Sequence, residues 1–221
     1  MTESYPSSAL PKQRNDQAGG LIRALTNTGP VGRFFQNDAS FDCLYPKHLQ
    51  QISSRHWTPL KVARAAAAYL AVPGSRILDI GSGTGKFCLT AAELHPQCHF
   101  FGAEHREELV EYADRALQYL ALKNANFKHV NVTQVDFNRF DHFYFYNAFY
   151  ENIDQQHAID ERVELSRSLY DYYANYIHHA LKHRPAGTRV VTYQADQEII
   201  PASYKLVAMS FKQMLKLWIS E

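Results

Sequence analysis

The sequence predicts an α/β protein: a three-layer sandwich with a mainly parallel seven-stranded sheet that ends in an antiparallel C-terminal hairpin. Short apolar runs alternate with amphipathic helical stretches from residue 58 onward, which favours parallel strands joined by crossover helices. In the stretch 76–94 the first apolar run is followed by a glycine-rich turn and then by a helix-compatible segment. This order is typical of a strand, a ligand-binding loop and the start of a helix. A chain of 221 residues with 46% hydrophobic content can bury one core of this kind.

Composition indicates the cellular environment of the protein but not its function. The net charge of +1 and the pI near 7.8 permit a nucleic-acid partner without indicating one. The three cysteines, Cys43, Cys88 and Cys98, are too scattered for a disulfide framework, and no paired metal-ligand motif is present. With no signal-like N-terminus and no apolar run of membrane-spanning length, we expect a soluble, cytoplasmic protein without a metal or membrane partner.

Three segments are expected along the chain. Residues 1–20 are rich in Ser, Pro, Gln, Asn and Gly and predict a mobile tail. Residues 21–57 predict a cap, with a short helix at Leu21–Leu25 followed by an irregular, aromatic-rich stretch. The main domain spans 58–221 and opens with a helix for which Thr58 is the expected N-cap and Pro59 the first residue.

The glycine-rich stretch at 76–86 reads R-I-L-D-I-G-S-G-T-G-K, and its spacing separates three kinds of ligand loop. The dinucleotide fingerprint G-x-G-x-x-G needs a third glycine at position 86, where the chain has Lys86. The P-loop pattern fails because only three residues separate Gly81 from Gly85 and Phe87 follows the lysine. The pattern that remains is D-x-G-x-G-x-G.

This pattern resembles the first motif of the class I (Rossmann-like) S-adenosylmethionine-dependent methyltransferases. The resemblance implies that S-adenosyl-L-methionine binds at Asp79, Gly81, Ser82, Gly83, Thr84 and Gly85. A second apolar run ends in Glu104, followed by His105, and in this family an acid at that place holds the ribose of the cofactor. The alternative is a surface glutamate at the end of a strand.

A helix at 107–122 and a third strand at 127–135 are expected next, and that strand delivers Asp136 and Phe137. In related methyltransferases an acid after the third strand accepts a hydrogen bond from the adenine amine, with an aromatic residue beside the ring. The resemblance therefore adds Asp136 and Phe137 to the cofactor site. Ordinary turn chemistry is the alternative for the aspartate.

A fourth strand at 142–146 delivers Asn147, Ala148, Phe149 and Tyr150 to the carboxyl edge of the sheet, where open α/β sheets bind ligands. The tetrapeptide resembles the N-P-P-Y motif of amino-group methyltransferases with both prolines absent. Non-SET histone lysine methyltransferases also carry an Asn and aromatic residues after this strand. The resemblance implies catalytic roles for Asn147 and Tyr150, and cofactor contact for Asn147. The alternatives are a helix-capping asparagine and a core tyrosine.

The C-terminal third predicts a long amphipathic helix from about 160 to 183 and a fifth strand at 188–193. Two short strands at 204–210 and 214–219 complete the sheet as an antiparallel hairpin.

The resemblance implies an S-adenosylmethionine-dependent methyltransferase that N-methylates a protein or nucleic-acid acceptor. A small-molecule methyltransferase and a non-catalytic S-adenosylmethionine-binding module are the alternatives. A nucleotide-binding oxidoreductase is disfavoured by Lys86. The identity of the methyl acceptor, the acceptor atom and the oligomeric state are left open by the sequence.

Overall fold

The structure is a computed structural model that describes residues 31–160 and 162–221. Phe34–Glu221 forms one compact unit. The predicted tail at 1–20 and the short helix at Leu21–Leu25 lie outside the described residues. Among the described helices, none is both long and apolar enough to cross a membrane.

The unit Phe34–Glu221 is built on a seven-stranded sheet with the order β3-β2-β1-β4-β5-β7-β6. The first five strands pair in parallel, and β7 runs antiparallel to both β5 and β6. The predicted fold class is therefore confirmed, including the C-terminal hairpin. The strands are β1 Arg76–Ile80, β2 His99–Glu104, β3 Ala125–His129, β4 His142–Tyr146, β5 Arg189–Tyr193, β6 Tyr204–Ser210 and β7 Leu215–Ser220.

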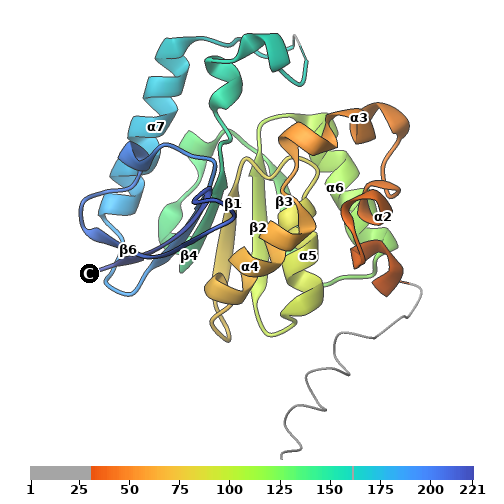
Figure 1. Cartoon of the computed structure of the whole chain (residues 1–221), viewed down its shortest axis with the longest axis horizontal. Helices are drawn as coiled ribbons and strands as arrows, with labels where there is room; N and C mark the ends of the chain where they lie inside the picture. Colours follow the sequence, from red (N-terminus) through yellow and green to blue (C-terminus); the bar gives the residue numbers. More distant parts are fainter. Residues whose placement is uncertain (1–30, 161) are drawn as a thin grey trace, which may run out of the picture. The chain divides into compact units, whose positions relative to one another are not determined.

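Helices cover both faces of this sheet (Figure 1). Helices α4, α5 and α6 contact one face, while α7 packs on the other with Ile177 in the same core as Leu78 and Phe143. The central strands are buried on both faces, so they are nearly continuous apolar runs. The helices are α2 Asp38–Asp42, α3 Lys47–His56, α4 Leu60–Leu70, α5 Lys86–Leu94, α6 Glu107–Tyr119 and α7 Arg167–Lys182, with 3₁₀ turns η1 Gly32–Phe35, η2 Val132–Gln134, η3 Phe137–Arg139, η4 Tyr150–Asn152, η5 Gln155–His157 and η6 Gln197–Ile199.

The segment before α4 is helical, which corrects the expectation of an irregular stretch there. Asn37 caps α2 because its side chain accepts a hydrogen bond from the Ser40 N–H at 2.9 Å. Pro46 precedes the first turn of α3 in extended backbone. Of the aromatic residues that suggested irregular structure, Phe41 is the buried residue of α2 and Phe35 that of η1, and Tyr45 is buried between α2 and α3.

Helix α4 begins at Leu60, and the prediction of Thr58 as its N-cap is wrong. The Thr58 hydroxyl instead lies 3.0 Å from the hydroxyl of Tyr144 on β4. The N–H of Leu60 donates to Asp38 Oδ1 at 2.8 Å, so the cap comes from α2. Because Asp38, 22 residues earlier in the chain, accepts this hydrogen bond, α4 does not need a cap from the Thr58 side chain.

The third strand ends at His129, earlier than its apolar alternation predicted. The Asn131 side chain accepts a hydrogen bond from the Thr133 N–H at 3.0 Å and turns the chain into η2. Asp136 then caps η3 by accepting from the Asn138 N–H at 3.0 Å. The residues that follow β3 at the sheet edge are therefore Val130 and Asn131.

Two helices are shorter than predicted. Helix α6 ends at Tyr119, three residues early. Helix α7 begins at Arg167, after Ser166 caps it by accepting from the Leu169 N–H, so the chain from 147 to 166 is a connection with two 3₁₀ turns. We refer to this segment, described at 147–160 and 162–166, as the β4–α7 connection.

Candidate active site

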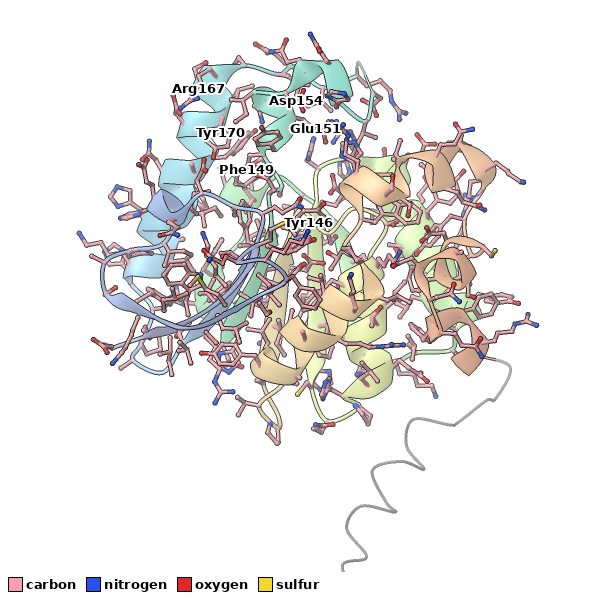
Figure 2. All side chains as sticks on the ribbon, in the orientation of Figure 1. Tyr146, Phe149, Glu151, Asp154, Arg167 and Tyr170 are labelled. Carbon is pink, nitrogen blue, oxygen red and sulfur yellow. The ribbon has the colours of Figure 1, made fainter. Side chains whose placement is uncertain are left out.

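A cavity of about 320 Å³ lies at the carboxyl edge of the sheet, where the ends of β1 to β5 all contribute lining residues. From β1 to β5 these include Gly83, Glu104, Asn131, Asn147 and Gln194. The other walls come from the end of α3, the β4–α7 connection and α7. Figure 2 shows Phe149, Glu151 and Asp154 above Tyr146, with Tyr170 and Arg167 of α7 to their left. The volume suits a small organic ligand.

The three glycines of the first loop serve different physical needs. Gly81 has φ +73°, and a Cβ there would lie 2.3 Å from the Cβ of Ala148, so this glycine lets the loops after β1 and β4 touch. A Cβ on Gly85 would meet the Phe127 ring at 2.5 Å, which is a packing constraint. Gly83, at φ +53°, has nothing within 4 Å of its Cβ position and lines the cavity, so its backbone is accessible to a ligand.

Glu104, at the end of β2, is 5% exposed and lines the cavity. One carboxylate oxygen accepts from the Gly83 N–H at 2.9 Å, and the other accepts from the Arg106 N–H at 2.9 Å. Burial raises the pKa of Glu104, but the His105 imidazole at 3.1 Å and these two N–H donors outweigh it, so the pKa lies below its ordinary value. An ionised carboxylate therefore faces the cavity and anchors the glycine loop.

A smaller hollow of about 20 Å³ lies beside the glycine loop and is lined by Asp79, Ser82 and Thr84, with Trp57 from the cap. The Ser82 and Thr84 hydroxyl oxygens are buried without a hydrogen-bond partner among the described residues. Such groups are costly unless something pairs with them, so they are available to a bound ligand or to water. Asp79 is 3% exposed, and the Cys88 thiol lies 3.6 Å from its Oδ2.

The buried carboxyl of Asp79 makes the stability of the cofactor-free protein depend on pH. Burial raises the pKa of Asp79 to about 8, and the negative charge of Glu104 adds to this rise. The folded protein keeps a proton that the unfolded chain releases above about pH 4, so stability should fall as pH rises from 5 to 8, by at most about 1.4 kcal/mol per pH unit. Denaturant unfolding across this range should show a flatter slope in Asp79→Asn, and an identical slope would contradict the assignment.

Asn147 and Tyr150 both line the cavity, directly after β4. Asn147 has φ +40°, a conformation that asparagine tolerates better than most residues, and its side chain makes no hydrogen bond to another described residue. Its alternative role as a side-chain helix cap is not observed, since η4 has Phe149 at its cap position without a side-chain bond. Tyr150 is 45% exposed and is not a core aromatic residue.

The β4–α7 connection is tied to the start of α6 and to α3 by ion pairs that the sequence did not indicate. The Arg106 guanidinium is 6% exposed and pairs with Glu151 at 2.8 Å and Asp160 at 3.3 Å. Arg55, at the end of α3, lies 3.4 Å from Asp154. Because the pairing partners lie 45 to 99 residues apart in the chain, only the folded structure brings them together.

Asp136 and Phe137, which the resemblance assigns to the cofactor site, do not line this cavity but a separate hollow beside α7. Phe137 is 5% exposed and stacks on Phe143 in the core beneath α7, while the Asp136 carboxylate caps η3. Val130, Asn131 and Val132 line the cavity at this level of the sheet. The signal in the sequence was Asn131 itself, a turn residue that ends the strand five residues before Asp136.

The other predicted site residues divide into three groups. Gly81, Gly83, Glu104, His105, Asn147 and Tyr150 line the main cavity. Asp79, Ser82 and Thr84 line the smaller hollow, which Gly81 also borders. Gly85 lines neither and packs against Phe127. Sequence reasoning missed Asn131, Gln194 and the end of α3.

A family model described as a methyltransferase domain matches residues 71–197, which is more than half of the chain. The chain therefore belongs to the methyltransferase-domain family. The match includes β1 to β5 and with them every strand that lines the cavity.

Three individual proteins show the extent of this relationship. The uncharacterized protein RP789 of Rickettsia prowazekii (strain Madrid E) is 33% identical over 145 residues, covering 64% of this chain and 26% of that protein. The tRNA (guanine-N(7)-)-methyltransferase of Synechococcus sp. (strain JA-3-3Ab) is 31% identical over 86 residues, 39% of this chain and 36% of that enzyme. The chain thus spans about a quarter to a third of these relatives. Magnesium protoporphyrin IX methyltransferase (ChlM) from Synechocystis PCC 6803, solved with bound SAM, shares the fold with a TM-score of 0.52 at 15% identity, over 94% of this chain and 93% of that one.

Proposed function

We propose that this protein is an S-adenosylmethionine-dependent methyltransferase that transfers a methyl group to a nitrogen atom of a nucleic-acid or protein acceptor. The observation that carries the proposal is the single cavity that brings Gly83 and Glu104 together with Asn147 and Tyr150. The first pair suits a cofactor and the second pair suits an acceptor. Membership of the methyltransferase-domain family supports the same reaction class.

The residues present fit the cofactor. Glu104 is ionised, buried and aimed at the cavity, and its Oε2 keeps an acceptor position for a ribose hydroxyl after bonding the Gly83 N–H. The open Cβ position of Gly83 leaves room for close approach of a ligand to the backbone. The unpaired hydroxyls of Ser82 and Thr84 supply further polar groups beside the same loop. S-adenosylmethionine, when bound, supplies a methyl group on a positively charged sulfur.

The remaining task of the chain is to orient the acceptor and keep water out. Asn147 lines the cavity, and its side-chain carbonyl oxygen can accept a hydrogen bond from an N–H group of the methyl-accepting substrate. Burial lowers the pKa of His56, which lines the same cavity, so its imidazole is neutral at pH 7 and can take up a proton. Arg106 and Glu151 also line the cavity, and their ion pair at 2.8 Å leaves neither of these charges uncompensated there.

Between the two acceptor classes we favour a nucleic-acid base. The half-exposed ring of Tyr150 at the cavity offers a flat surface on which an unstacked base can stack. The printed name of the Synechococcus relative, a tRNA (guanine-N(7)-)-methyltransferase, supports the same class. A peptide amide or amine is the alternative, and the experiment below distinguishes them.

We expect S-adenosylhomocysteine to bind the purified protein and raise its melting temperature, whereas NADH should do neither. Isothermal titration calorimetry and a thermal shift assay measure both effects. Failure of S-adenosylmethionine and S-adenosylhomocysteine to bind well-folded protein would refute the proposal.

Methyl transfer is tested with tritiated S-adenosylmethionine and cell extract divided into RNA, DNA, protein and small-molecule fractions. Label in RNA or DNA supports the favoured acceptor, and label in protein supports the alternative. Label confined to small metabolites would overturn the acceptor assignment. Tight cofactor binding with no label in any fraction would identify a non-catalytic binding module.

A further inference from the structure

We propose that Tyr45 is a positioning residue for cofactor binding, which holds the glycine loop in its binding conformation through a backbone carbonyl of that loop. Tyr45 lies between α2 and α3, 39 residues before Thr84 in the sequence. It forms part of a latch that we define as Tyr45 and Lys86 with their partners Thr84, Asp38 and Asp42. This inference rests on the proposed function, because it assigns a task within the same cofactor site.

The Tyr45 hydroxyl donates a hydrogen bond to the backbone carbonyl of Thr84, at 2.8 Å. Tyr45 is only 3% exposed, and its ring packs against Trp57 with centroids 4.8 Å apart. Burial raises the pKa of Tyr45 far above its ordinary value, so the hydroxyl remains a donor at every physiological pH. Because the bond ends on a loop carbonyl, it restrains the backbone between Gly83 and Gly85 directly.

Lys86 adds an ionic contact to the same end of the loop. It is the first residue of α5, it is 3% exposed, and its Nζ lies 2.8 Å from both Asp38 Oδ1 and Asp42 Oδ1. A lysine at a helix N-terminus opposes the helix dipole, so the two α2 carboxylates are needed to compensate it. Burial raises the pKa of Asp38, but the Lys86 bond and the Leu60 N–H outweigh it and lower that pKa below its ordinary value.

Different atoms of the loop are therefore open to a ligand and held by the latch. Gly83 opens on the cavity, and the Thr84 hydroxyl has no partner among the described residues, whereas the Thr84 carbonyl is held by Tyr45. Three glycines at positive φ make such a loop flexible in isolation. A protein whose binding-competent loop is only partly populated binds ligand more weakly by that fraction, so the latch should act on affinity.

The chain offers a matched control for Tyr45 in Tyr204, the first residue of β6. Tyr204 is 6% exposed, and its hydroxyl donates to the Leu181 carbonyl at 3.2 Å, at the end of α7. Tyr45→Phe and Tyr204→Phe each remove one buried hydroxyl that bonds a backbone carbonyl. Only the first of these carbonyls belongs to the glycine loop.

The experiment measures S-adenosylhomocysteine affinity by calorimetry at 20 °C, with the denaturation midpoint of each variant. Tyr45→Phe should weaken binding about 3- to 10-fold, and Tyr204→Phe should leave it unchanged despite a similar loss of stability. Equal affinity in Tyr45→Phe and the unsubstituted protein would overturn the inference, as would equal weakening in both variants. Absence of binding to the unsubstituted protein would instead be a failure of the proposed function.

A second pair of variants keeps the test independent of the tyrosine. Lys86→Met should weaken S-adenosylhomocysteine binding more than Tyr45→Phe does, because it leaves two carboxylates facing the loop without their cation. Lys86→Arg retains the charge and should restore most of the affinity. If Lys86→Met folds and binds the ligand normally, the ionic part of the latch plays no role in binding. If Lys86→Met fails to fold, Tyr45→Phe and Tyr204→Phe decide the question alone.

Discussion

Glu104→Ala is expected to weaken S-adenosylhomocysteine binding at least about 10-fold. The substitution removes a charged acceptor for the ribose hydroxyls, and hydrogen bonds to charged groups contribute about 1.5–3 kcal/mol each. It also removes the oxygen that accepts the Gly83 N–H, so the loop loses an internal anchor together with the ligand contact. Both losses act on affinity, which calorimetric titration of the variant measures.

Glu104→Gln separates these two contributions. Its amide oxygen can still accept one N–H, but it carries no charge and offers fewer acceptor positions. We expect an affinity between those of the unsubstituted protein and Glu104→Ala. An unchanged dissociation constant in folded Glu104→Ala would mean that the carboxylate at the end of β2 does not contact the cofactor.

Asn147→Ala is expected to reduce methyl transfer about 10- to 100-fold while leaving cofactor affinity nearly intact. The lost hydrogen bond belongs to the acceptor, so the effect should appear in the turnover rate and not in S-adenosylhomocysteine binding. Single-turnover transfer of tritium to the labelled fraction of the extract measures the rate per folded molecule.

The backbone of Asn147 requires a specific control. At φ +40° an alanine is strained by about 1–2 kcal/mol, so Asn147→Ala should also lose stability. Asn147→Gly removes the same side chain without this strain. If the amide orients the acceptor, both variants lose turnover and only the alanine variant loses stability in proportion to the strain. A destabilised but fully active Asn147→Ala would remove Asn147 from the active site.

The sequence by itself determined the parallel core and the place of the ligand loop. Both are local signals: apolar runs such as Ile77–Ile80 and His142–Tyr146 are short and β-rich, and three glycines at alternate positions permit few other structures. The end of β2 at Glu104 followed from the same reasoning, since an apolar run stops at a carboxylate. The fold class, and the cavity residues that come from the glycine loop and from the end of β2, were therefore predictable from the sequence.

Tertiary structure decided which side chains surround that loop. Asn131 lines the cavity and Asp136 does not, because the Asn131 side chain turns the chain into η2 directly after β3, whereas Asp136 lies next to Phe137, which stacks on Phe143 in the core. Thr58 matched a helix-capping pattern, yet Asp38 caps α4 because α2 folds against it. The bond from Tyr45 to Thr84 spans 39 residues and leaves no periodic trace in the sequence, because a long-range contact depends on where the chain returns and not on its local pattern.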